Sequence, residues 1–132
     1  MVRVKVIVAG SRKWPWRQYL MDALDFYLQN YRPEEIQIVN GTAGGPDSWG
    51  GEWADAHGVE QLKMPADWDG LGRKAGMVRN RAMAEVATHL IAFWDGESPG
   101  TKAMIEIATD LGLVVRVLNL KRIRQAMGVN DV

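Results

Sequence analysis

Three glycine-bearing segments of the chain combine residue types that can bind an anion. The first, Gly10-Ser11-Arg12, offers backbone amides, a hydroxyl and a guanidinium within three residues. The second, residues 41–47, has three glycines within five residues, so a ligand can approach the backbone closely. The third, residues 96–101, places small residues at an expected helix start, where free N–H groups can bind a phosphate. Each segment also has a simpler explanation. The first can be an ordinary turn, the second a flexible surface loop and the third a helix cap without a ligand.

Other side chains are candidates because they lie next to these segments. Arg79 is at the edge of a predicted buried helix face, where it can extend toward an anion or remain an ordinary surface arginine. Trp94 ends a predicted strand and Trp68 lies in a loop at residues 65–68, so either indole can contact a ligand or simply pack. The carboxylates at loop positions, each otherwise a helix cap or a solvated turn, are Asp47, Asp95 and Glu97.

The sequence lacks the motifs of several common chemistries. Neither GxGxxG nor GxxxxGK[ST] occurs, so no dinucleotide fingerprint or P-loop indicates a cofactor. No GxSxG elbow surrounds a serine, there is no cysteine, and no spacing of histidines and carboxylates indicates a metal. His57 is expected at a helix end and His89 at a strand start, so they do not form a catalytic pair. No cofactor, metal or catalytic residue is therefore assigned.

Strands and helices alternate along the chain. Apolar runs rich in β-branched residues predict buried strands at residues 2–9, 36–40, 59–64, 90–94 and 113–118. The helical spacing of apolar residues predicts helices at about residues 15–28, 47–57, 76–87 and 99–112. Asp47 and Ser98 are the expected caps of the second and fourth helices, and Gly50 and Gly51 weaken the second.

This alternation predicts a single Rossmann-like α/β domain over residues 1–118. Parallel strands need crossover connections, so the five strands form a doubly wound parallel sheet of expected order 3-2-1-4-5. Ligands bind such sheets at the carboxyl ends of the strands, where the order reverses between strands 1 and 4. The loops after strands 1, 2 and 4 therefore belong to one expected site. Residues 119–132 form a basic tail or a short helix.

Composition narrows the classes of partner. Sixteen basic residues balance sixteen acidic ones among 132 residues, which argues against a surface built for long nucleic acids. Acidic residues dominate residues 22–69 and basic residues dominate the flanking segments, so the fold can still build a local anion site. No apolar run is long enough to cross a bilayer, and the first residues do not resemble a signal peptide. A cytoplasmic protein without a membrane partner is expected.

Five stretches in the same order resemble one protein family: VIVAGSR, GTAGGPD, PADW, GRKAGMVRNRAM and FWDGESPGT. They are similar to the YspA-type, cpYpsA-related branch of the SLOG superfamily, small Rossmann-like proteins of bacteria and phages, over about residues 4–118. The resemblance implies binding of a nucleotide or a nucleotide-derived ligand. The residues that it implies for the pocket are Gly10, Ser11, Arg12, Gly41, Thr42, Ala43, Lys74, Arg79, Asn80, Gly96, Ser98, Gly100 and Thr101.

More distant relatives in that superfamily are the LOG phosphoribohydrolases, once labelled lysine decarboxylases. Their pattern has a catalytic glutamate three residues after the threonine of a glycine-rich loop, and here that position is Met104. Glu106 lies about 200° further around the helix and is a poor substitute. A thioether neither stabilises positive charge nor activates water, so the resemblance does not carry hydrolysis by that route to this chain.

The expected function is binding or sensing of a nucleotide or nucleotide-derived ligand at the carboxyl ends of the strands. One alternative is a nucleotide hydrolase that cleaves an N-glycosidic or phosphate bond with Asp47, Asp95 or Glu97. A second alternative is a protein-interaction module without a ligand. Exposed tryptophans and the habit of the resembled family favour assembly into a homo-oligomer.

Overall fold

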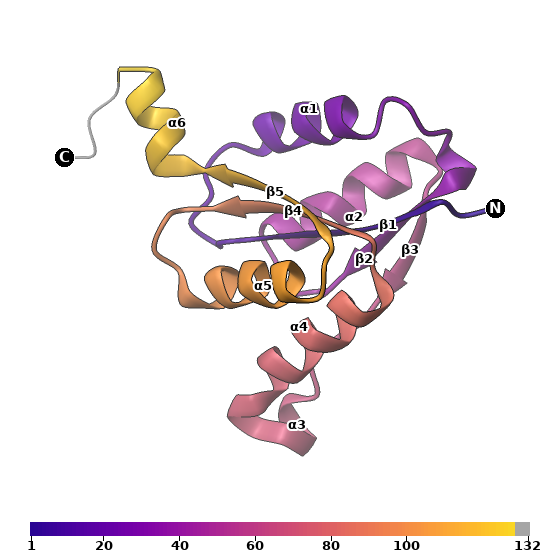
Figure 1. Cartoon of the computed structure of the whole chain (residues 1–132), viewed down its shortest axis with the longest axis vertical. Helices are drawn as coiled ribbons and strands as arrows, with labels where there is room; N and C mark the ends of the chain where they lie inside the picture. The colour runs from indigo at the N-terminus through magenta and orange to yellow at the C-terminus, as the bar shows by residue number, and fades with distance from the viewer. Residues whose placement is uncertain (129–132) are drawn as a thin grey trace.

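A parallel sheet of five strands forms the centre of the structure, a computed structural model that describes residues 1–128. Its order is β3-β2-β1-β4-β5, with β1 in the middle (Figure 1). The predicted fold class and strand order are confirmed, and the strand ends differ from the predicted ones by at most two residues. The strands are β1 (Val4–Gly10), β2 (Ile36–Asn40), β3 (Glu60–Lys63), β4 (His89–Trp94) and β5 (Val114–Asn119).

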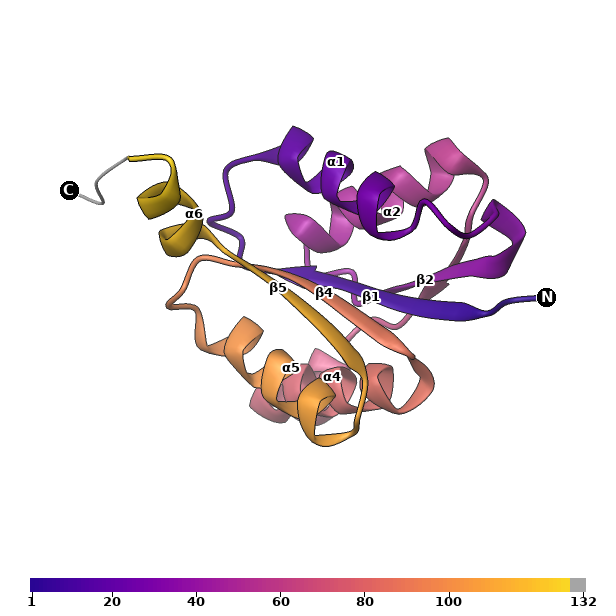
Figure 2. The same ribbon diagram turned by 45° about the horizontal axis from the view of Figure 1, so that its top comes forward.

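Helices cover both faces of the sheet, because the side chains of each strand alternate between the faces. Val4, Val6 and Val8 of β1 pack against α1 and α2, whereas Ile7 and Ala9 pack on the face of α4 and α5 (Figure 2). In the part of the chain that the structure describes, no helix is long and apolar enough to cross a membrane. The bounds of these helices are α1 (Arg17–Tyr27), α2 (Pro46–His57), α4 (Ala75–Val86) and α5 (Pro99–Asp110).

The chain between β1 and α1 is held against the end of β4 by an aromatic contact. Trp14 is buried, and its ring meets that of Phe93 edge-on at 5.3 Å between centroids. Leu20 and Leu24 then continue the same core from the inner side of α1. The segment that leaves β1 is therefore fixed from the first residues after the strand.

Two glycines let α2 pack closely on the sheet. A Cβ at Gly50 would lie 2.7 Å from the Cβ of Val8, and one at Gly51 would lie 2.9 Å from Nδ2 of Asn40. At Gly50 the clash is with the Cβ of Val8 itself, whereas at Gly51 the ends of the Asn40 and Gln61 side chains would have to shift. Gly50, which lowers helix propensity, is therefore required by the close packing. The helix thereby brings its first turn to the carboxyl ends of β1 and β2.

The sequence predicts none of three short elements: the 3-10 turns η1 (Pro33–Glu35) and η2 (Gly72–Lys74), and the helix α3 (Trp68–Leu71). Elements of three or four residues have no apolar periodicity to detect. After β5 the chain forms the helix α6 (Leu120–Ala126). Residues 129–132 of the predicted C-terminal segment lie outside the described residues.

Replacing Gly50 by alanine should destabilise the protein, although alanine is the better helix former. The clash with Val8 is expected to cost about 1–3 kcal/mol, more than the roughly 1 kcal/mol that alanine gains in a helix. Gly100→Ala in α5 is the matched control, because the space beside Gly100 is open, and it should stabilise the protein by up to about 1 kcal/mol. Urea unfolding of the two variants measures both effects, and a stabilising Gly50→Ala would contradict the packing argument.

Candidate ligand-binding site

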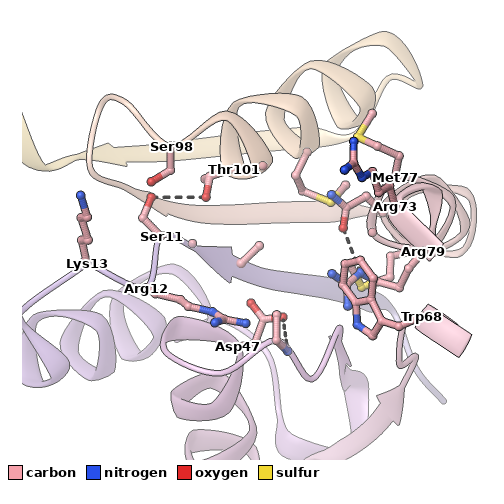
Figure 3. Close-up of a pocket in the computed structure, with 18 residues that line it drawn as sticks. Ser11, Arg12, Lys13, Asp47, Trp68, Arg73, Met77, Arg79, Ser98 and Thr101 are labelled. Atoms are coloured by element: carbon pink, nitrogen blue, oxygen red, sulfur yellow. Dashed lines mark hydrogen bonds between the residues drawn. The ribbon is translucent and has the colours of Figure 1, made fainter.

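A cavity of about 480 Å³ lies at the carboxyl ends of the central strands, between the loops after β1 and β2 and the helices α4 and α5. Figure 3 shows Ser11, Ser98 and Thr101 at one end of it and Trp68, Arg73 and Met77 at the other. Most of the predicted site residues line this cavity. They are Gly10, Ser11, Arg12, Ala43, Asp47, Trp68, Arg79, Asn80, Ser98, Gly100 and Thr101.

Gly10 and Ser11 join the end of β1 to the end of β4. A Cβ at Gly10 would clash with the carbonyl oxygen of Phe93 and would lie 2.8 Å from Cγ of Pro46, so only glycine fits. Ser11 is buried, its N–H donates to the Phe93 carbonyl at 3.0 Å, and its Oγ accepts from the Asp95 N–H at 3.1 Å. The same Oγ lies 3.3 Å from Oγ1 of Thr101 in the first turn of α5. Two hydroxyls from distant parts of the chain thus meet at the cavity wall.

Asp95 organises the start of α5 rather than the interior of the cavity. Its Oδ1 accepts from the N–H groups of Glu97 and Ser98 at 2.9 and 2.7 Å, and its Oδ2 accepts from Oγ of Ser98 at 2.6 Å. Burial alone would raise the pKa of Asp95, but these hydrogen bonds outweigh it and lower the pKa to about 2. Ser98 occupies the predicted cap position of α5, yet its own side chain makes no capping bond because it is bound to Asp95.

Gly100 and Thr101 supply the backbone amides that α5 presents to the cavity. They lie in the first turn, where N–H groups have no partner within the helix, and Pro99 before them has no N–H. Gly100 has open space where a side chain would lie. The N-terminus of α5 therefore offers donors and a positive partial charge to an anion.

Asp47 is buried at the opposite wall, in the first turn of α2. The cap position of this helix belongs to Gly45, so the prediction that Asp47 caps it is wrong. The side chain instead accepts from the Ala43 N–H at 3.2 Å and closes the loop after β2. Burial raises the pKa of Asp47 to about 6, although that hydrogen bond and the charges of Arg79 and Arg12 act in the opposite direction.

Arg79 bridges α4 and the loop after β2. Its Nη1 donates to the carbonyl oxygen of Gly41, and its Nε donates to Oδ1 of Asn80 at 3.0 Å. A Cβ at Gly41 would lie 2.9 Å from Oδ2 of Asp47 and 3.0 Å from Nη1 of Arg79, so a side chain here would displace these two charged groups. Arg79 therefore positions this loop as well as lining the cavity, while Gly41 lies behind the two charged groups.

Trp94 lies outside the cavity, unlike its predicted position beside a ligand. Its Nε1 donates to the carbonyl oxygen of Ser98 at 3.1 Å, which holds the indole beside the end of β5 and α6. There it lines a second hollow of about 430 Å³ together with Leu118, Arg122 and Ile123.

Three further predicted residues also lie outside the cavity. Thr42 is exposed, with a φ of 59° that is uncommon for a β-branched residue, and its N–H donates to Oδ1 of Asn40 at 2.8 Å. Lys74 is exposed in η2. A Cβ at Gly96 would lie 3.0 Å from Cδ of Lys121, so this glycine packs against α6.

The structure adds cavity residues that the sequence did not single out as site residues. Lys13 and Arg73 join Arg12 and Arg79, so four cations surround the cavity and Asp47 is the carboxylate that faces it. Both Lys13 and Arg73 belong to the basic segments that flank residues 22–69. The apolar part of the lining includes Ala9, Gly76, Met77, Met83 and Met104. Within residues 1–128, no group of three or more His, Asp or Glu side chains is placed to hold a metal ion.

A doubly wound parallel sheet with a basic, hydroxyl-bearing cavity at its switch point defines a Rossmann-like α/β protein with a candidate ligand site. The model of the YspA, cpYpsA-related SLOG family matches residues 4–70 of the chain. The chain is also 32% identical to the Gene 61 protein of Mycobacterium phage D29 over 117 residues, which cover 84% of this chain and 93% of that protein. The chain therefore belongs to the YspA, cpYpsA-related SLOG family. The comparison with solved structures gave no match.

Replacing Asp47 by asparagine should change stability in a pH-dependent way. The raised pKa means that the folded protein holds more protons than the unfolded chain between about pH 4 and 6, so the free energy of unfolding falls as the pH rises through this window. Asp47→Asn removes this loss, and we expect it to stabilise the protein by about 1–3 kcal/mol at pH 7.5. The gain should fall below about 1 kcal/mol at pH 4, where Asp47 is protonated in the folded protein and the unfolded chain is close to its own pKa of 3.8.

Urea unfolding at pH 7.5 and pH 4 measures the difference. The exposed Asp69 provides a control, because Asp69→Asn should change the free energy of unfolding by less than about 0.5 kcal/mol at either pH. An equal effect of Asp47→Asn at both pH values would show that its carboxylate is not destabilised by burial.

Proposed function

We propose that this protein binds or senses a nucleotide or a nucleotide-derived ligand through its phosphate, in the cavity at the start of α5. The observation that carries this proposal is the meeting of three loops at one end of the sheet. Ser11 and Thr101 place their hydroxyls 3.3 Å apart there, beside the first turn of α5. Membership of a SLOG family supports a nucleotide-type ligand.

Charge and size support the same class of ligand. Arg12, Lys13, Arg73 and Arg79 line the cavity, so a local positive field exists on a chain whose formal net charge is zero. A phosphate that enters can take hydrogen bonds from backbone amides and hydroxyls while these cations offset its charge. A volume of about 480 Å³ falls in the range of small-molecule pockets, which commonly hold roughly 300–1,000 Å³.

The floor of the cavity favours binding over hydrolysis by the LOG route. Met104, at the position of the LOG glutamate, is buried and lines the cavity. A thioether at this wall provides an apolar contact and no proton transfer. We therefore place binding or sensing ahead of turnover.

Binding should be measurable with the four nucleoside 5′-monophosphates, NAD and ADP-ribose by calorimetry and by the melting temperature. Gly100→Ala should weaken the binding of any of these that binds by roughly tenfold or more, because Gly100 lines the cavity and the added methyl group would occupy open space there. Lys102→Ala is the matched control on the same helix, since Lys102 is exposed and does not line the cavity. Full affinity in Gly100→Ala would place the phosphate elsewhere, and the absence of any binding would favour a protein-interaction module.

A second candidate function, hydrolysis of an N-glycosidic or phosphate bond, is favoured by one observation on Asp47. Of the three candidate carboxylates, Asp47 lines the cavity, whereas Asp95 is occupied by hydrogen bonds and Glu97 pairs with Lys121 at 2.7 Å. A carboxylate with a pKa near 6 is suited to accept a proton near neutral pH. In N-glycosidic cleavage Asp47 would take a proton from water, whose oxygen bonds to C1′ as the C–N bond breaks. The departing base nitrogen keeps the electron pair and is then protonated.

Mass spectrometry after incubation with the same compounds tests this second candidate. If the protein is a hydrolase of this kind, ribose 5-phosphate and free base, or orthophosphate, should accumulate with the wild type and disappear with Asp47→Asn. Glu97→Gln is the control and should leave turnover unchanged, because Glu97 lies outside the cavity. Substrate recovered intact with every compound would leave binding as the function.

A further inference from the structure

An exposed indole forms part of the cavity wall at the end away from α5. Trp68 is 60% exposed, whereas Trp14 and Trp53 are 2% and 4% exposed. In the part of the chain that the structure describes, no aromatic ring or cation stacks on Trp68. Large aromatic side chains usually bury most of their surface. The exposed surface of this indole is therefore available for contact with another molecule.

The local structure holds this indole in place. Asp67 caps α3 by accepting from the Gly70 N–H at 2.9 Å, and its carbonyl accepts from the Leu71 N–H at the same distance. A Cβ at Gly76 would lie 3.4 Å from Cη2 of Trp68, so the ring edge rests on the first turn of α4. The short helix therefore presents a positioned ring to the cavity.

The cavity is chemically different at its two ends. Hydroxyls and the α5 amides lie at one end, while Trp68 lies at the other, together with Arg73 and the half-exposed Met77 (Figure 3). Met83 and Met104 line the cavity as well and are buried. A ligand that fits both ends has an anionic group joined to a flat group that can stack on the indole.

We propose that Trp68 is the stacking platform for the base of the bound nucleotide, with its phosphate at the start of α5. This inference rests on the proposed function and adds the orientation of the ligand and the residue that recognises its base. The indole face stacks on any purine or pyrimidine, because every base has a π face. Met77 adds a polarisable thioether to the same end of the cavity. The sequence allowed either Trp94 or Trp68 to contact a ligand. We assign this contact to Trp68, because Trp94 lies beside α6.

The test compares ligands with and without a base. The probes are the four nucleoside 5′-monophosphates and ribose 5-phosphate, titrated by calorimetry into wild type and Trp68→Ala. We expect Trp68→Ala to weaken binding of the nucleotides roughly 10- to 100-fold, as removal of a stacking partner does, and to change binding of ribose 5-phosphate by less than about twofold. Trp68→Phe should keep most of the nucleotide affinity.

Two further measurements separate stacking from an effect on folding. Phe26→Ala is the matched control, since Phe26 is 64% exposed on α1 and does not line the cavity. It should leave both affinities unchanged. Nucleotide binding should quench tryptophan fluorescence in the wild type, and Trp68→Phe should lose most of this quenching while it still binds.

The outcomes distinguish this inference from the proposed function. Nucleotide binding that is equally strong in Trp68→Ala, or that weakens together with binding of ribose 5-phosphate, overturns the stacking role and leaves the proposed function standing. Failure of these five compounds, and also of NAD and ADP-ribose, to bind the wild type overturns both.

Discussion

The approach of β1 to β4 at their carboxyl ends is the constraint on which the candidate site depends. Gly10 has no side chain, so the carbonyl of Phe93 and the ring of Pro46 can lie against it. Ser11 then follows directly into contact with Asp95 and Thr101. Gly50 lets α2 pack closely on β1, so the first turn of α2 reaches the same edge of the sheet. The loops after β1, β2 and β4 and the first turns of α2 and α5 therefore surround one cavity.

Charges around the cavity are divided between those that build it and those that face a ligand. The carboxylate of Asp95 accepts hydrogen bonds from the segment that leads into α5. These hydrogen bonds lower the pKa of Asp95 and fix the conformation of the loop after β4. Asp47 faces the cavity at a raised pKa, and Arg79 ties the neighbouring loop to α4. The exposed cations Arg12, Lys13 and Arg73 do little for the fold, so they are the groups most available to an anion.

The sheet and much of the site geometry could be predicted from sequence, because alternating strands and helices leave few topologies and place the loops after β1, β2 and β4 at one edge. That is why Ser11, Asp47 and Thr101 line one cavity. Side-chain direction could not be predicted: one hydrogen bond from the indole to Ser98 turns Trp94 toward α6. The short α3, which presents Trp68, has no periodic signal, and the family match to residues 4–70 ends before Arg79 and α5.

The contact between Ser11 and Thr101 joins residues 90 positions apart, and three crossover connections lie between β1 and β4 in the chain: β1 to β2, β2 to β3 and β3 to β4. Such long-range parallel pairing is slow to form, because the entropy of closing a large loop is lost before the contacts compensate for it. During synthesis on the ribosome, β1 and Gly10 can pair with β4 only after most of the chain has emerged. The cavity therefore exists only in the finished protein, and an incomplete nascent chain has no means of holding the ligand.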